Sequence, residues 1–445
     1  MKRRWIGSGR SVALCVIATA LALGCGGGEG EVEDTAVPSG ERSIIVIAID
    51  GLRADSLGAF GGDLGTPNFD ALAAESYHFQ WAFAQSADPA ASFAALMTGL
   101  YPTTSGVVGS GDRLPDEAPT LAESLVSAGL ATAAFVEGEP GGDDFGLAQG
   151  FDRFSLSSAA GAEAGQWLAE RSDGEFLLVL RGWSVGLDFA PETVGAEAPA
   201  GFFDRLQEVL ASDFTDNPQA LEPADLEYVK ALYAQRIRAA DTALGELMAN
   251  LESLGLADRA TLVLTGTSGL DLEEHGPSGS VSLHATVTRV PLFIRLPGGH
   301  GAGSVDKIVE LIDVMPTLLD LSGTGTPAGV QGASLIPIMD GTGRPPYIAF
   351  SESPHLGEQR AVAMGGMRMV TSTEAGAVAL FDLGADPAEY TNIAESAPDR
   401  VEVLQRHLEA WSKMVSVSSL DPERRTEEEL DDETLEQLKS LGYIQ

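Results

Sequence analysis

The sequence predicts an α/β fold with a mostly parallel, helix-covered sheet and a smaller C-terminal antiparallel α+β subdomain. The first indication is an unbroken apolar run at 44–49, which is typical of a strand buried on both faces. Further apolar runs alternate with amphipathic helical patterns, an order that favours a parallel sheet. Beyond residue 346, short apolar runs follow one another as in an antiparallel meander.

The pattern also assigns the individual elements. In the larger domain, 43–345, we expect strands at 44–49, 130–136, 176–180, 261–264 and 290–295, and helices at 69–75, 93–100, 120–128, 162–170, 225–254 and 308–321. The helix at 225–254 is the longest, because its apolar residues keep to one stripe until Gly255. In the subdomain, 346–445, we expect strands at 348–351, 360–364, 367–371 and 378–381, a helix at 401–414 and a charged helical tail.

The N-terminus carries a targeting pattern. Basic residues precede an apolar stretch at 11–23 that is too short to span a bilayer, and a small residue then precedes Cys25. This pattern resembles a bacterial lipoprotein signal peptide over 1–24, with Cys25 as the lipid attachment site. Residues 25–42 are rich in Gly and Glu and are expected to form a lipidated flexible tether.

The predicted lipid anchor indicates a location in the cell. We expect a lipid-anchored protein of the bacterial cell envelope that faces the periplasm or the exterior, and Gly26 after Cys25 favours the outer membrane. The chain has 65 acidic and 27 basic residues and a formal net charge of -38. This charge excludes nucleic acid as a partner, because phosphates need basic contacts.

Three segments carry a family pattern. They read Asp50-Gly-Leu-Arg-Ala-Asp-Ser-Leu-Gly, Thr66-Pro-Asn-Phe-Asp-Ala-Leu-Ala and Leu96-Met-Thr-Gly-Leu-Tyr-Pro. Over 43–445 the chain resembles the sulfatases of the alkaline-phosphatase superfamily. The resemblance implies a sulfuric-ester hydrolase site with a calcium ion, a formylglycine nucleophile made from Cys or Ser, and Lys and His side chains that hold the anion and move protons.

The nucleophile position of that family departs from the pattern. Counting back from Thr98 places Pro89 there, and proline cannot become formylglycine. Phe93 takes the position of an Arg or His, and only Ser92 remains of the motif Cys-x-Pro-Ser-Arg. We therefore predict no catalytic residue at Pro89. Ser92 is expected to cap the following helix, and its alternative role is that of a substitute nucleophile.

The metal and proton-transfer positions depart as well. Asp50 alone remains of the calcium carboxylates, since Thr267 and Ser268 stand at the positions of the second pair. Calcium needs six to eight oxygen ligands, so we interpret Asp50 as a vestigial ligand and expect no cofactor, with calcium only if the site is retained. The remaining changes are Arg181 to Gly186 in place of His-x-x-Asp-x-His, Val136 to Glu139 in place of Gly-Lys-x-His, and Ser280 in place of a Lys.

Several polar residues keep a candidate role. Glu137, Glu139 and Asp271 follow predicted strands and, with Asp50, form a hypothetical relocated cation site. His275 and His284 either line the former site or are ordinary hydrogen-bonded loop residues.

These departures predict a catalytically inactive sulfatase-like lipoprotein, a pseudoenzyme with a binding or scaffolding role. Its expected partners are the membrane, through the lipid, and a sulfated or phosphorylated glycan or a protein. One alternative is a divergent sulfuric-ester or phosphoric-ester hydrolase with a reassigned nucleophile and metal site. Another is a structural envelope protein that binds no ligand.

Overall fold

The computed structural model describes most of the chain after residue 41. The described residues are 42–140, 142–171, 173–186, 198–202, 204–205, 222–272, 274–275, 282–343, 347–354, 358–373, 376–423, 425 and 434–435. Ala36–Gln445 form one compact unit, separate from Met1–Thr35. Cys25, the predicted tether before residue 42 and nearly all of the predicted tail lie outside the described residues.

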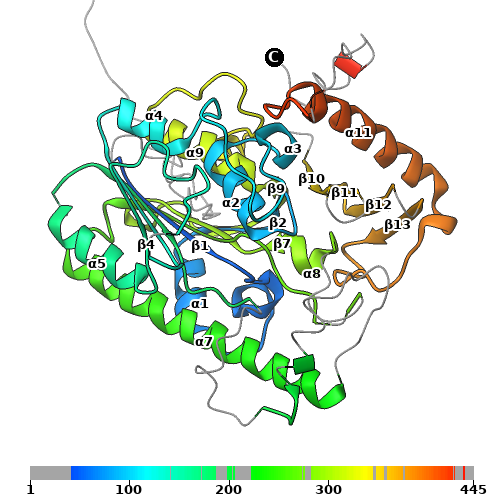
Figure 1. Ribbon diagram of the computed structural model, residues 1–445, viewed down its shortest axis with the longest axis horizontal. Coiled ribbons are helices and arrows are strands. Elements are labelled where there is room, and N and C mark those ends of the chain that lie inside the picture. The colour runs from blue at the N-terminus through cyan, green and yellow to red at the C-terminus, as the bar shows by residue number, and fades with distance from the viewer. Residues whose placement is uncertain are drawn as a thin grey trace, which may run out of the picture. The chain divides into compact units, whose positions relative to one another are not determined.

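The central strand is β1 (Ser43–Ile49), and it runs parallel to both neighbours, β5 (Phe176–Arg181) and β6 (Ala260–Gly266). Beyond β5 lie β3 (Ala131–Val136) and β4 (Arg153–Leu156), which are also parallel. In Figure 1, β4 lies on the opposite side of β1 from β7. Within the described residues the sheet has nine strands, in the order β4-β3-β5-β1-β6-β8-β2-β7 with β9 paired to β2. The predicted mostly parallel sheet is confirmed on this side of β1.

The far side of the sheet is mixed. β2 (Tyr77–Phe83) pairs antiparallel with β7 (Arg289–Val290) and β8 (Leu292–Arg295), and parallel with β9 (Gly303–Glu310). The predicted single strand at 290–295 is interrupted at Pro291, which lacks the N–H that a continuous ladder requires.

One predicted element is wrong in its first part. The helix expected at 308–321 begins as the end of β9, continues as a 3-10 turn at Leu311–Asp313 and becomes helical only in α9 (Val314–Leu321). A short apolar run fits a buried strand and a buried helix equally well, and pairing with β2 decides between them here.

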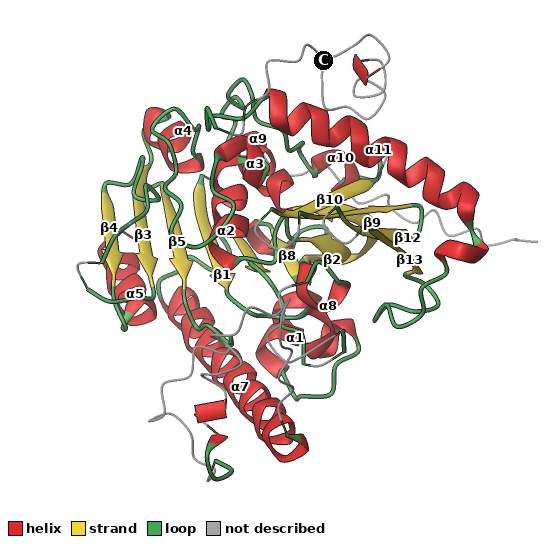
Figure 2. Cartoon of the chain, turned by 45° about the vertical axis from the view of Figure 1, so that its right-hand side comes forward, coloured by secondary structure: helices red, strands yellow, loops and turns green. Residues whose placement is uncertain are grey.

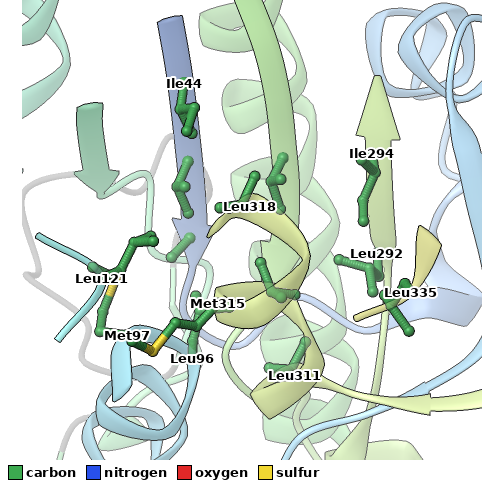
Figure 3. Close-up of a cluster of buried hydrophobic side chains, with 14 of the residues drawn as sticks. Ile44, Leu96, Met97, Leu121, Leu292, Ile294, Leu311, Met315, Leu318 and Leu335 are labelled. Carbon is green, nitrogen blue, oxygen red and sulfur yellow. The ribbon is translucent and has the colours of Figure 1, made fainter. Parts of the chain in front are cut away.

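Helices cover both faces of the sheet (Figure 2). On one face the structure places α1 (Pro67–Ala74), α5 (Ala160–Arg171) and α7 (Pro223–Ser253), and on the other α2 (Pro89–Thr98), α4 (Leu121–Ser127) and α9. The side chains of β1 alternate between the two resulting cores. Ile45 and Ile47 pack toward α7, whereas Ile44 lies in the core with Leu121 and Leu318 (Figure 3).

The C-terminal subdomain is a four-stranded antiparallel sheet crossed by one long helix. Its elements are β10 (Ile348–Ser353), β11 (Gln359–Met364), β12 (Met367–Ser372), β13 (Ala377–Asp382) and α11 (Pro398–Val417). Trp411 of α11 stacks on Phe350 at 4.9 Å and meets Tyr101 of the larger domain edge-on at 5.2 Å. The subdomain therefore shares a core with the parallel sheet.

The described part also contains the short α-helices α3 (Pro102–Ser105), α8 (Ala285–Thr288) and α10 (Ile336–Met339). Short 3-10 helices lie at Ala54–Ser56, Gly58–Phe60, Pro297–Gly299 and Ala394–Ser396. Among the residues that could be placed, no helix combines the length and the apolar character that crossing a membrane requires.

Candidate functional site

The candidate site lies where four neighbouring parallel strands end. The strands are β3, β5, β1 and β6, and their last or next residues are Glu137, Arg181, Asp50 and Thr267. Because parallel strands end at the same edge of a sheet, residues far apart in the sequence meet there, and ligands of open α/β sheets bind at such an edge.

Asp50 is held by an arginine. The Nη2 atom of Arg181 donates to Oδ2 of Asp50 at 2.8 Å, and its Nε donates to Oδ1 at 3.1 Å. The hydroxyl of Thr267 donates to the same Oδ1 at 2.6 Å. The two charged side chains are only 16% (Arg181) and 23% (Asp50) exposed, so this bidentate pair is well shielded from water.

The changed positions contact one another. Arg181 stands where the family pattern implies a His, Thr267 where it implies a carboxylate, and Phe93 where it implies an Arg or His. In the structure the guanidinium of Arg181 lies 5.0 Å from the centre of the Phe93 ring and binds the Asp50 carboxylate that Thr267 also contacts. The changes together build one internal ion pair.

This donor set does not fit calcium. Both carboxylate oxygens of Asp50 already accept hydrogen bonds, and the neutral hydroxyls of Thr267 and Ser268 stand where the family pattern implies an Asp and a His or Asn. Calcium takes six to eight oxygens, several of them charged. Among the described residues, no three His, Cys, Asp or Glu side chains converge on a possible metal site, so the hypothetical cluster of Asp50 with Glu137, Glu139 and Asp271 does not assemble.

Pro89 begins a helix at the position where the nucleophile is expected. It is the first residue of α2, where a fixed φ suits a helix start. The cap is Asp88, whose Oδ1 accepts from the backbone N–H groups of Ala90 and Ala91 at 2.8 and 3.1 Å. The expectation that Ser92 caps the helix is therefore wrong.

Ser92 lies inside the first turn of α2 and is fully buried. Its hydroxyl donates to the backbone oxygen of Ser86 at 2.8 Å and accepts from the Ser86 N–H at 3.1 Å. In this arrangement the hydroxyl ties the loop before α2 to the helix.

A cavity of about 560 Å³ opens beside the ion pair. Asp50 and Arg181 line one side of it, and Gln235 and Arg236 of α7 line another. Arg236 donates from Nη1 to the backbone oxygen of Gly186 at 2.6 Å. Glu137 also lines this cavity, so two of the four predicted carboxylates share one surface.

The two candidate histidines form a separate cluster. Their rings stack with centres 3.8 Å apart and planes 7° apart. The Nδ1 atom of His275 lies 2.9 Å from Oδ2 of Asp271, and that of His284 lies 2.9 Å from Oε2 of Glu389. Burial by itself lowers the pKa of His275, but its hydrogen bond with Asp271 and the Asp271 charge outweigh this, so the pKa is raised.

Glu389 is a residue of this cluster that sequence reasoning missed. Its carboxylate is buried, accepts from the backbone N–H of Ala285 at 3.0 Å and pairs with Arg368. Burial by itself raises the pKa of Glu389, but the charge of Arg368 and the hydrogen bond from His284 outweigh this effect, so the pKa is lowered. Glu389 also has a positive φ of 62°, which is strained for a side chain of this size. Ser280, the predicted replacement for the family Lys, lies outside the described residues.

Family models and curated proteins match this chain. The family model described as Sulfatase matches residues 42–177 and 190–324, and the model described as N-sulphoglucosamine sulphohydrolase, C-terminal, matches residues 274–415. Among curated proteins, mouse arylsulfatase K is 26% identical over 241 residues, which are 51% of this chain and 42% of the mouse protein. An N-acetylglucosamine-6-O-sulfatase of Bacteroides thetaiotaomicron is 30% identical over 190 residues, 39% of this chain and 34% of that protein. Each match thus spans less than half of the relative.

Solved structures with the same fold are similar over most of their length. A 2-O GAG sulfatase has a TM-score of 0.69 at 20% identity and covers 89% of this chain and 96% of its own. The phosphonate monoester hydrolase of Agrobacterium radiobacter has a TM-score of 0.65 at 23% identity and covers 83% and 94%. At these identities the structures establish the fold, and the Sulfatase model covers more than half of the chain. The chain therefore belongs to the sulfatase family.

Proposed function

We propose that this sulfatase-family chain binds a ligand at its sheet edge and does not hydrolyse it. The observation that carries the proposal is the ion pair between Arg181 and Asp50 at the carboxyl ends of β5 and β1. The remaining carboxylate is neutralised by a cation that belongs to the protein itself. A metal ion that binds Asp50 must first displace this guanidinium.

The chemistry of the neighbouring residues supports the same conclusion. Pro89 offers no nucleophile, and the Ser92 hydroxyl both donates to and accepts from the backbone of Ser86. Arg181, which stands where a proton-transferring His is implied, offers N–H donors and no acceptor, so it cannot act as a general base. A cavity remains beside these groups, so the arrangement keeps a place for a ligand without the groups that break a sulfate ester.

We also propose that the domain works at the bacterial envelope, attached to a membrane through a lipid on Cys25. The support is the N-terminal sequence pattern alone. Replacing Cys25 with Ser is expected to move the protein from the membrane to the soluble fraction in the native host. Retention of this variant in the membrane fraction contradicts lipid anchoring.

The test of inactivity combines metal content with turnover. The protein from Ser43 onward is dialysed against calcium and magnesium, analysed for bound metal, and assayed with aryl sulfates, phosphates and phosphonates. We expect no stoichiometric metal and no product above that formed by the Asp50→Ala and Ser92→Ala variants. About one tightly held cation per chain, or turnover that either variant abolishes, overturns the proposal.

A gain-of-function variant sharpens this test. Arg181→Ala with Thr267→Asp removes the internal cation and restores a second carboxylate beside Asp50. We expect this double variant to bind calcium more tightly than both the wild type and Arg181→Ala alone, because the charge of the ligands sets calcium affinity. Equal calcium binding by all three proteins means that the ion pair does not block the site.

A further inference from the structure

Two cavities adjoin along one side of α7. The cavity beside Asp50 has a neighbour of about 540 Å³, and Glu137 and Gly182 line both. The residues of α7 that line them follow one stripe of the helix, first Leu232, Gln235, Arg236 and Ala239, then Ala243, Glu246, Leu247 and Asn250. Because the stripe is continuous and the two volumes share a wall, we treat them as one surface, the α7 cleft.

A strained tryptophan lies at the junction of the two cavities. Trp183 follows Gly182 directly, lines the second cavity and has a φ of 58°, which is a genuine outlier for a bulky residue. Hydrogen bonds of the two residues that follow Trp183 help to hold this conformation. Ser184 donates to the Glu137 carboxylate at 3.2 Å, and Val185 donates to the backbone oxygen of Asp50 at 2.9 Å.

The neighbouring helix leaves space for the indole ring of Trp183. Gly161 of α5 lies beside it, and a Cβ at this position would come within 2.9 Å of the Trp183 Nε1 atom. Gly161, which has no side chain, lies on one side of the ring, and the strained backbone of Trp183 lies on the other. The partly exposed ring therefore forms part of the wall of the cleft. Strain of this kind is kept at positions where the surrounding structure serves a ligand.

The charges of the cleft decide which ligand it favours. Its described lining carries three carboxylates and two guanidinium groups, a net formal charge of -1. Both guanidinium groups are engaged, Arg181 by Asp50 and Arg236 by the backbone oxygen of Gly186. A sulfate or phosphate ester brings a negative charge that this lining does not balance, and its desolvation is then uncompensated.

We propose that the α7 cleft binds an uncharged oligosaccharide chain, one of whose sugar rings packs its apolar face against Trp183. This inference rests on the proposed function, since it assigns a ligand to a site that does not hydrolyse. Gln235 and Asn250 supply amide donors and acceptors at the two ends of the stripe, as a ligand with many hydroxyl groups requires. Leu232, Ala239, Ala243 and Leu247 supply the apolar surface between them.

The first experiment varies ligand charge on one sugar backbone. Neutral tetrasaccharides (chitotetraose, cellotetraose and mannotetraose) are titrated by calorimetry into the protein from Ser43 onward. The form that binds is then compared with its 6-O-sulfated and amino-bearing counterparts. We expect one sulfate to weaken binding about five-fold or more, because the described lining carries a net formal charge of -1 and both of its guanidinium groups are engaged.

Variants of the protein locate the binding surface. Trp183→Gly is expected to keep the fold, because glycine accepts a positive φ, and to weaken binding about ten-fold through loss of the ring. Asn250→Ala, at the far end, is expected to weaken a tetrasaccharide more than a disaccharide. The matched control is Trp81→Ala, which removes an indole that lines a different cavity and leaves binding unchanged.

Each result has a defined meaning. Absence of saturable binding by every neutral tetrasaccharide up to about 10 mM overturns the inference. Tighter binding of the sulfated or amino-bearing form also overturns it. Unchanged binding by Trp183→Gly does so as well. Release of sulfate from the sulfated tetrasaccharide overturns the proposed lack of hydrolysis instead. Binding and sulfate release are measured on the same samples, so the two failures are distinguishable.

Discussion

Arg181 and Asp50 form an ion pair across residues that are 131 positions apart in the sequence. The sequence around each residue does not predict this pairing. The aromatic ring of Phe93 lies against the guanidinium, and the Thr267 hydroxyl lies against the carboxylate, so both charges are packed as well as paired. A charge pair this well shielded is costly to break from one side only, because the partner stays behind without compensation.

We expect Arg181→Ala to lower the free energy of unfolding by about 1–3 kcal/mol, less than for a fully buried pair because both side chains keep some exposure. Adding Asp50→Ala should recover part of this loss, because it removes the orphaned carboxylate, and a double-mutant cycle in urea measures the coupling. The control is Arg113→Ala, which breaks ion pairs with Asp143 and Asp144 at a side chain that is 60% exposed and should change stability by no more than about 0.5 kcal/mol. Additive single mutants contradict coupling.

The stacked histidines predict a pH dependence. The pKa of His275 is raised above its ordinary 6.5, so its contribution to stability is fully present below pH 6.5 and is lost as the pH rises through the folded-state pKa. The pKa of Asp271 is lowered from 3.8, and its contribution disappears only in acid, as the pH falls through its folded-state value. Wild-type stability should therefore fall as the pH rises above 6.5 and through the folded-state pKa of His275, relative to His275→Gln.

Urea unfolding at a series of pH values checks this expectation. His300→Gln is the control, since His300 is an exposed histidine. The stability difference between His275→Gln and the wild type should shrink toward alkaline pH, and His300→Gln measures the effect of replacing an exposed histidine outside the cluster. A constant difference for both variants shows that protonation of His275 does not stabilise the fold.

At the scale of elements, α2 shows how a changed residue can suit its new role. Proline at the first helical position sacrifices no hydrogen bond, and Asp88 before it supplies the cap. The same Asp88 also accepts from the backbone N–H and the hydroxyl of Ser110, both at 2.8 Å. A position implied for a nucleophile has become part of a stable helix start.

Asp88→Ala is expected to lower the free energy of unfolding by about 1–2 kcal/mol, because two backbone N–H groups of α2 lose their acceptor. Asp88→Asn should lose less, since its amide oxygen can still accept both bonds. Thermal and urea unfolding of the two variants measure the difference. Equal stability of Asp88→Ala and the wild type contradicts a capping role.

At the scale of the whole molecule, the two sheets depend on each other. The hydroxyl of Tyr101 donates to the buried Glu310 at 2.9 Å, and the backbone N–H of Phe350 in the subdomain donates to the same carboxylate at 2.8 Å. Glu352 in β10 accepts from the backbone N–H and the hydroxyl of Thr103, both at 2.7 Å. Removing either part leaves buried polar groups without partners.

Trp411→Ala is therefore expected to cost about 3–5 kcal/mol and to destabilise both sheets in one transition. Near-UV and far-UV circular dichroism, followed together in urea, measure this. Val378→Ala, at a position that is 39% exposed, is the control and should stay within about 0.5 kcal/mol of the wild type. Independent folding of residues 43–345 with wild-type stability contradicts the shared core.

Strand periodicity and helix stripes were sufficient for much of the fold. β1 is buried on both faces as its unbroken apolar run predicts, and α7 follows its predicted stripe to within two residues at each end. Local patterns succeed here because neighbours in the chain set the period of burial. β2 and β4 escaped prediction because polar residues interrupt their apolar pattern, and 308–310 was misassigned because its partner strand lies more than 200 residues away.

From the sequence alone, comparison with the family pattern predicts which groups the site does not contain. Pro89, Phe93 and Thr267 could be recognised because the family pattern keeps its register on either side of each of them. The contacts of the residues at these positions follow from the three-dimensional fold. Arg181, Trp183 and Glu389 acquire their roles from partners that strand order and loop packing bring together, and no local period encodes such contacts between distant segments. An internal cation can neutralise Asp50 only because β1 and β5 pair in the register that places their ends side by side.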